Sequence, residues 1–130
     1  MDHGKVLAAA FAAAVMIASA PAFAGGDAAA GKKVFQQHLC FSCHSFDEGK
    51  NGVGPSLHGV FGRKAGEAPG YTYSDALKGS GIVWTAENLD KWVQGPTKVV
   101  KGTKMILAKP VSDATDRENL IAYIQEESTK

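Results

Sequence analysis

The segment Cys40-Phe41-Ser42-Cys43-His44 constrains this chain more than any other, because it holds the only two cysteines among 130 residues. Two cysteines three positions apart, followed by a histidine, serve three kinds of site. They can form a redox dithiol, supply part of a zinc site, or anchor a covalent haem. The rest of the sequence decides among these three interpretations.

The dithiol and the zinc site both fit poorly. A thioredoxin-like dithiol follows a β-strand in a βαβ unit, whereas this motif follows a predicted helix and the chain shows no strand pattern. A structural zinc site needs four ligands, usually from two paired sets, and the chain has no second cysteine pair. The third interpretation explains the spacing, because each thiol can add to one vinyl group on the same porphyrin edge while His44 turns toward the iron. The motif therefore favours c-type haem attachment.

The first 24 residues resemble a Sec-type signal peptide. Lys5 gives a short positive region, residues 6–20 form an apolar run, and Ala22-Phe23-Ala24 fits the small-x-small rule for cleavage. The apolar run is shorter than the about 20 residues that a membrane-spanning helix needs. We predict cleavage after Ala24 and export of residues 25–130 to the periplasm, with an uncleaved anchor as the alternative. Export fits haem attachment, which takes place outside the cytoplasm.

Charge is balanced overall but unevenly distributed. The 14 Lys and Arg residues nearly equal the 13 Asp and Glu residues, which argues against a general nucleic-acid-binding protein. Between residues 94 and 110, however, four lysines occur without an acid. This segment is a candidate for an exposed basic surface.

Apolar periodicity and capping residues predict three main helices, over residues 27–38, 84–94 and about 114–127. Asp27 and Thr85 are suitable N-caps, and Leu120, Ile121, Tyr123 and Ile124 form a stripe on the last helix. Residues 46–81 are rich in Gly, Pro, Ser and Asn and hold no period. Because such a long irregular segment is unusual in a compact domain, we expect an apolar cofactor to supply part of its core. The predicted fold is all-α, with about three main helices and long loops around one covalent haem.

A haem iron held by His44 needs a second axial ligand, and the candidates are Met105, His38 and His58. Met105 is the only methionine beyond residue 24, and it lies in an irregular segment rather than on an apolar helix face, where a methionine would simply fill the core. A thioether is a soft ligand that favours Fe(II). His38 lies too near the attachment motif to reach the opposite face, and His58 is expected at the surface.

Seven blocks in order now resemble class I c-type cytochromes, the group of mitochondrial cytochrome c and bacterial cytochrome c2. These blocks are GKKVF, CFSCH, GPSLHGVFGRKAG, APGYTYSDA, GIVW, VVKGTKMI and RENLIAYI. The resemblance runs from about residue 31 to residue 123. It implies the class I cytochrome c fold and one covalent haem c.

The resemblance also implies roles for individual residues. Cys40 and Cys43 would carry the thioethers, and His44 and Met105 would be the axial ligands of the iron. The residues expected around the haem are Pro55 (carbonyl acceptor for His44), Arg63, Tyr73 and Trp84 (haem propionates) and Thr103 (loop packing). Gly31 and Phe35 would contact Leu120 and Tyr123 between the first and last helices.

Two positions depart from the family pattern near the expected Met105 ligand. Trp92 stands where the mitochondrial family usually has a tyrosine, and Leu77 replaces a usual asparagine. We expect these changes to remove polar groups from that side of the haem and to shift its reduction potential. Leu39 also stands where a lysine is common before the first cysteine.

These inferences predict a one-electron carrier rather than an enzyme, because an iron with both axial positions filled has no vacancy for a substrate. The carrier would move electrons from a quinol–cytochrome c oxidoreductase (bc1-type complex) to a terminal oxidase or a photosynthetic reaction centre, and we expect a monomer. Basic residues would steer acidic partners to the haem edge, namely Lys32, Lys33, Lys98, Lys101 and Lys104. The alternatives are a peroxidase-like or gas-binding haem protein and an electron-entry subunit of a larger oxidoreductase.

Overall fold

The computed structural model describes residues 25–130, so the predicted signal peptide, residues 1–24, lies outside the described residues. The elements are, in chain order, α1 (Ala28–Gln37), the 3-10 turn η1 (Cys40–Ser42), α2 (Asp75–Lys78), α3 (Ala86–Val93), α4 (Pro96–Val99) and α5 (Ala114–Ser128). Across residues 25–130 there is no β-strand, only an isolated bridge between Lys64 and Val83. The all-α prediction is confirmed.

The three predicted helices correspond to α1, α3 and α5, and side chains cap each of them. Asp27 accepts a hydrogen bond from the Ala29 N–H at 2.9 Å, and Thr85 accepts one from the Asn88 N–H at 3.1 Å. Asp113 caps α5. The additional elements α2, α4 and η1 have three or four residues each, too few for an apolar period to be visible in the sequence.

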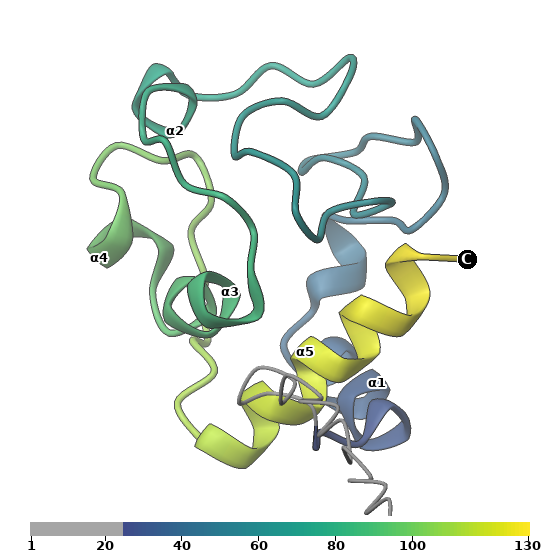
Figure 1. The fold of residues 1–130 in the computed structure, drawn as a ribbon. Helices are drawn as coiled ribbons and strands as arrows, with labels where there is room; N and C mark the ends of the chain where they lie inside the picture. Colours follow the sequence, from purple (N-terminus) through teal and green to yellow (C-terminus); the bar gives the residue numbers. More distant parts are fainter. Residues whose placement is uncertain (1–24) are drawn as a thin grey trace, which may run out of the picture.

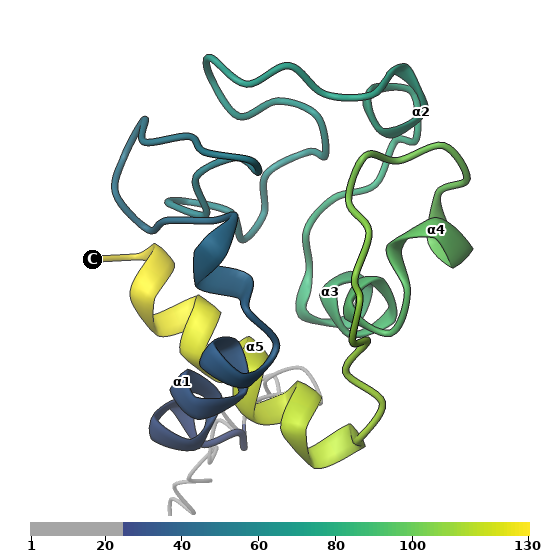
Figure 2. The same ribbon diagram turned by 180° about the vertical axis from the view of Figure 1, so that it is seen from behind.

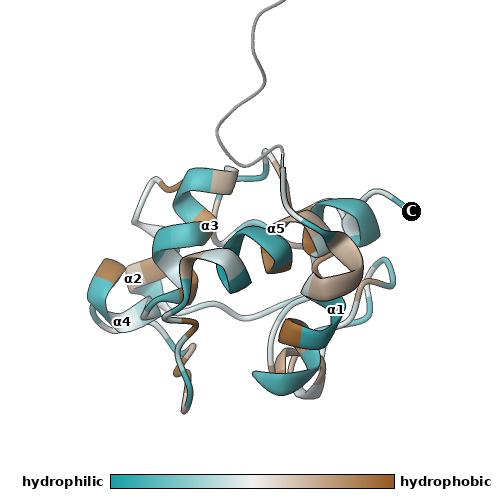
Figure 3. Cartoon of the chain, turned by 90° about the horizontal axis from the view of Figure 1, so that it is seen from below, coloured by the Kyte–Doolittle hydropathy of each residue, from teal (hydrophilic) through white to brown (hydrophobic). Residues whose placement is uncertain are grey.

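The chain forms two halves in the ribbon (Figures 1 and 2). One half contains α1, α5 and the segment around η1, and the other contains α2, α3, α4 and the loop that leads from α4 toward α5. Figure 3 shows that α3 and α5 each carry both hydrophilic and hydrophobic residues. Their buried residues include Leu89, Trp92 and Val93 on α3 and Leu120 and Ile121 on α5.

Close packing of α1 on α5 organises the first half. A Cβ atom on Gly31 would collide with the main-chain carbonyl of Asn119 and lie 2.8 Å from the Cβ of Tyr123, so only glycine allows this approach. Three aromatic rings then surround the contact: Phe35, Phe46 and Tyr123 have centroids 5.3–5.6 Å apart. The predicted contact of Gly31 and Phe35 with the last helix is present at Tyr123.

Side chains rather than regular secondary structure hold most of residues 46–81. The Asn51 side chain donates to the Pro69 carbonyl at 3.0 Å and accepts from the Ser56 N–H at 2.9 Å. Ser56 in turn donates to the Asp47 carbonyl at 2.6 Å. These bonds satisfy backbone groups that have no helix or sheet partner.

No helix within residues 25–130 has the length and apolar character needed to cross a membrane.

Candidate haem-binding site

The two cysteines lie on one tight turn at the end of α1. Leu39 adopts a left-handed conformation with φ of 58°, and η1 then brings the Cys43 N–H within 3.2 Å of the Cys40 carbonyl oxygen. Both cysteines are free thiols and half-buried. Burial raises the pKa of the Cys40 thiol to about 11, so Cys40 is a protonated thiol at neutral pH before any cofactor is attached.

His44 presents one free ring nitrogen. Its Nδ1 lies 2.7 Å from the Pro55 carbonyl oxygen, and because a carbonyl only accepts, Nδ1 carries the proton. Nε2 therefore keeps its lone pair and has no hydrogen-bond partner among the described residues. Burial lowers the pKa of His44, an effect that the Pro55 hydrogen bond partly offsets. The ring is thus held as the neutral imidazole that ligates metals.

Gly54 is a site residue without an assigned role in the sequence predictions. A Cβ atom at this position would collide with Cε1 of His44 and lie 2.8 Å from its Nδ1. The imidazole therefore lies directly against the backbone of Gly54, and the carbonyl of the next residue, Pro55, holds it there. The signal in the sequence is the Gly-Pro pair itself, but only the fold shows that His44 needs it.

Met105 lies in the loop between α4 and α5, in the other half of the molecule. The indole N–H of Trp92 donates to its Sδ at 3.1 Å, and buried Thr103 accepts from the Met105 N–H at 3.4 Å. The expectation that Trp92 removes polarity near Met105 is wrong, because its N–H points at the sulfur. Leu77 is apolar and 7% exposed, within the same core as Trp92.

Of the three residues expected at the haem propionates, Arg63 is already engaged in loop contacts. It donates to the carbonyls of His58, at 2.8 Å, and Ser56, at 3.2 Å. The hydroxyl of Tyr73 accepts from the Ala68 N–H at 3.2 Å and retains its own proton for donation. Trp84 is buried with its ring centroid 5.0 Å from that of Trp92, and its indole N–H makes no hydrogen bond within residues 25–130, whereas its backbone N–H donates to the Arg63 carbonyl at 2.9 Å.

The five lysines expected at a docking surface come from two separate parts of the chain. Lys98 belongs to α4, and Lys101 and Lys104 follow it, whereas Lys32 and Lys33 belong to α1 in the other half (Figure 1). All five are exposed. Within residues 25–130 none of them forms an ion pair, although Lys104 donates to the Thr72 carbonyl at 3.0 Å.

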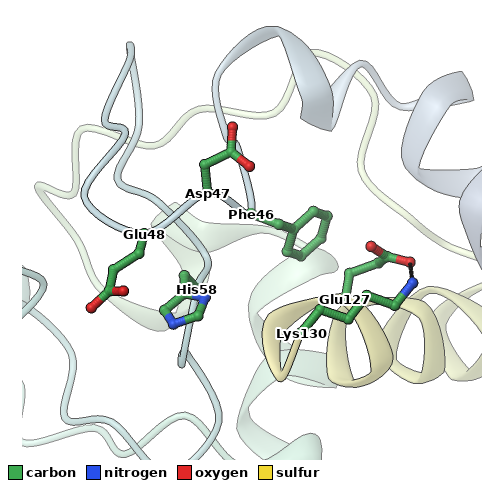
Figure 4. Close-up of a pocket in the computed structure, with 6 residues that line it drawn as sticks. All are labelled: Phe46, Asp47, Glu48, His58, Glu127 and Lys130. Carbon is green, nitrogen blue, oxygen red and sulfur yellow. Dashed lines mark hydrogen bonds and ion pairs between the residues drawn. The ribbon is translucent and has the colours of Figure 1, made fainter.

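Two surface cavities lie beside the cysteine motif and the segment that follows it. The first, of about 330 Å³, is lined by Phe35, Gln36, Phe41 and Tyr123. The second, of about 430 Å³, is shown in Figure 4; His58 is half-buried in its wall, while the carboxylates of Asp47 and Glu48 point away from the imidazole. Residues 25–130 contain no cluster of three or more His, Cys, Asp or Glu side chains arranged to bind a metal ion. A zinc site is therefore not supported there.

The donor set instead fits haem c. Two free thiols match two thioether bonds, the neutral imidazole of His44 has a free Nε2, and Met105 supplies a thioether from the loop between α4 and α5. This combination of imidazole and thioether donors is found in c-type cytochromes.

Comparison with known proteins agrees with these observations. The family model described as Cytochrome c matches residues 28–128. Cytochrome c type-1 of Ascaris suum is 46% identical over 110 residues, covering 85% of this chain and 96% of that protein. Cytochrome c2 of Blastochloris viridis is 47% identical over 113 residues, covering 86% and 87%. The structure of cytochrome cH from Methylobacterium extorquens aligns with a TM-score of 0.70 at 50% identity, covering 78% and 99%. The chain therefore belongs to the cytochrome c family, as a class I c-type cytochrome that binds haem c covalently and carries electrons rather than acting as an enzyme.

Proposed function

We propose that this protein is a periplasmic one-electron carrier in which Cys40 and Cys43 bind the haem through thioethers and His44 and Met105 are the axial ligands of its iron. The observation that carries this proposal is the geometry of His44. The Pro55 carbonyl oxygen lies 2.7 Å from Nδ1 and fixes the tautomer, so Nε2 keeps a lone pair that can bind the iron. His44 follows the end of η1, the turn that holds Cys40, by two positions.

The surrounding residues divide the remaining tasks. The haem supplies reversible Fe(III)/Fe(II) exchange, and the chain positions and shields it. Pro55 orients the imidazole, while Thr103 and Trp92 order the Met105 segment. The unused indole N–H of Trp84 and the O–H of Tyr73 would be donors for the haem propionates. Arg63 would favour the propionates by its positive charge, and its bonds to the loop carbonyls hold it in place.

The proposed route runs from a bc1-type complex to a terminal oxidase or a photosynthetic reaction centre. Exposed Lys98, Lys101 and Lys104 precede the proposed Met105 ligand in sequence and carry no carboxylate partner within residues 25–130. Such a surface attracts acidic partners and permits rapid, salt-dependent release. The cytochrome c2 similarity and the signal-like residues 1–24 support the periplasmic location.

The test is an optical spectrum of the mature holoprotein, oxidised and then reduced by ascorbate. A low-spin spectrum with the methionine-to-iron band of the oxidised form, and full reduction by this mild donor, is the expected result. A high-spin spectrum, or one that carbon monoxide changes at neutral pH, would show an open iron site. The gas-binding or peroxidase-like alternative would then replace the carrier.

A further inference from the structure

Residues 106–110, which follow Met105, have one hydrogen-bonded attachment to the rest of the described chain. Beyond them the Val111 N–H donates to the Val93 carbonyl at 2.9 Å, and Val111 is 2% exposed. Within them, only the Lys109 carbonyl oxygen has a partner among residues 25–130, Nδ1 of His38, at 2.6 Å. Packing adds little, because Ile106 is 78% exposed and residues 108–110 are also exposed.

The partner of this contact shows that Nδ1 of His38 carries a proton. A carbonyl oxygen only accepts, so Nδ1 is the donor. Both the neutral Nδ1–H tautomer and the imidazolium can make the bond. The contact therefore does not depend on which of these two forms is present.

His38 is held on a rigid element. It is the C-cap of α1, with its N–H directed to the Gln36 and Val34 carbonyls, and α1 packs closely on α5 through Gly31. The next residue, Leu39, is the only non-glycine residue with positive φ within residues 25–130. Its left-handed turn leads the chain away from the helix into the cysteine motif and leaves His38 at the junction.

This bond joins the segments that carry the two proposed iron ligands. His38 precedes Cys40 by two positions, and Lys109 follows Met105 by four. The two segments belong to opposite halves of the ribbon (Figures 1 and 2). This hydrogen bond across the halves would break if residues 106–110 moved outward, the motion that would take the Met105 sulfur away from a bound haem iron.

We propose that His38 is a positioning residue whose bond to the Lys109 carbonyl holds the Met105 loop closed; this inference rests on the proposed ligation by His44 and Met105. Loss of the bond shifts the closed–open equilibrium toward the open loop. The expected shift is about fivefold, the factor for one ordinary hydrogen bond whose carbonyl is rehydrated on opening.

Imidazole titration of the oxidised holoprotein measures this equilibrium, because imidazole binds the iron only after Met105 leaves. In His38→Ala, we expect imidazole to bind about fivefold more tightly and the methionine–iron band to disappear at correspondingly lower imidazole concentration. His38→Asn places an amide N–H near the position of Nδ1 and is expected to restore the wild-type affinity to within about twofold. His58→Ala is the matched control, since the His58 ring makes no hydrogen bond within residues 25–130.

The outcomes separate this inference from the function on which it rests. A normal wild-type methionine band with equal imidazole affinities in wild type and His38→Ala overturns the inference alone. A wild-type spectrum without that band overturns the proposed ligation and the inference with it. Equal tightening in His38→Ala and His58→Ala also overturns the inference, because it would report general loosening.

A measurement on the unmodified holoprotein covers the case in which His38→Ala fails to fold. The ¹⁵N chemical shifts of the His38 ring distinguish its two neutral tautomers. We expect the neutral ring to show the protonated-nitrogen shift at Nδ1 and the unprotonated shift at Nε2, with slow exchange of the Nδ1 proton. The opposite tautomer excludes the bond to Lys109 and overturns the inference.

Discussion

The indole N–H of Trp92 donates a hydrogen bond to Sδ of Met105 across 3.1 Å. Trp92 lies on α3 and is 5% exposed, and the ring of Trp84 packs on it at a tilt of 65°. The donor is thus rigidly placed. A hydrogen bond to the thioether withdraws electron density from the sulfur, so it disfavours the ferric state when that sulfur is an iron ligand.

Replacing this donor is therefore expected to lower the reduction potential. Trp92→Phe keeps an aromatic ring but removes the N–H. If the hydrogen bond contributes about 0.5–1 kcal/mol, the reduction potential should fall by about 20–45 mV, because a tenfold change in a one-electron equilibrium corresponds to 59 mV. Spectroelectrochemical titration measures it. Trp92→Tyr, which restores a donor, should recover part of the loss. A potential in Trp92→Phe equal to or above that of wild type contradicts the argument.

The apolar side chain of Leu77 is also expected to raise the reduction potential, because it keeps polar groups away from the haem. Leu77 is 7% exposed in the cluster that contains Trp84 and Trp92. An amide buried there lowers stability by about 1–3 kcal/mol and favours the ferric haem, so Leu77→Asn should melt earlier and have a lower potential. Leu77→Met, which preserves an apolar volume, serves as the control. An unchanged potential in Leu77→Asn would show that polarity at this position does not tune the haem.

The sequence predicted the helices that carry a full apolar period and a capping side chain. Asp27, Thr85 and Asp113 mark the starts of α1, α3 and α5, and local rules suffice there because cap and helix are neighbours. The one-turn helices α2 and α4 escaped prediction because four residues cannot show a period. Local signals also identified Cys40, Cys43 and His44 as one motif.

Contacts between distant segments could not be predicted in the same way. His38 and Lys109 are 71 positions apart, and the acceptor is a backbone carbonyl, which any residue type would supply. Asn51 likewise bridges two loops, by hydrogen bonds to the Pro69 carbonyl and from the Ser56 N–H. The sequence does not indicate these contacts, because both partners are backbone groups. The polarity near Met105 was wrongly predicted because residue identity at Trp92 does not show where its N–H points.

The contact between α1 and α5 predicts a large effect of a small substitution. Helix propensity alone would make Gly31→Ala stabilising by about 1 kcal/mol. The added methyl group would instead collide with the Asn119 carbonyl and Tyr123, so we expect a net loss of about 1–3 kcal/mol. Guanidinium unfolding of the holoprotein measures it. Gly52→Ala, whose Cβ would lie 3.4 Å from the Cys43 carbonyl, is the control; stabilisation by Gly31→Ala would contradict this packing.

Removal of the haem is expected to unfold the chain. Residues 46–81 contain only the four-residue helix α2, and α1 and α3, with 10 and 8 residues, are shorter than the ~12–15 residues at which isolated helices are marginal. The double variant Cys40→Ala/Cys43→Ala should therefore lose most of its helical circular dichroism and its cooperative melting. Cys40→Ala alone, which retains one thioether position, is the comparison. A double variant that melts cooperatively would show that the protein core suffices without haem.

The separation of the lysines into two groups predicts different electrostatic effects on electron transfer. Lys101 and Lys104 lie in the loop between α4 and Met105, whereas Lys32 and Lys33 lie on α1. Lys101→Glu/Lys104→Glu should slow oxidation by ferricyanide about two- to fivefold at low ionic strength, because the anion loses electrostatic attraction. The effect should vanish at high salt, where the Debye length falls to about 3 Å.

Lys32→Glu/Lys33→Glu makes the same change in net charge and is the matched control. If the haem edge is approached from the α4 side, this pair should change the ferricyanide rate less than the Lys101 and Lys104 pair does. A cationic oxidant of sufficiently high potential, such as tris(1,10-phenanthroline)cobalt(III), should respond with the opposite sign. Equal slowing by both double variants would mean that net charge alone, rather than the basic surface beside Met105, governs the encounter.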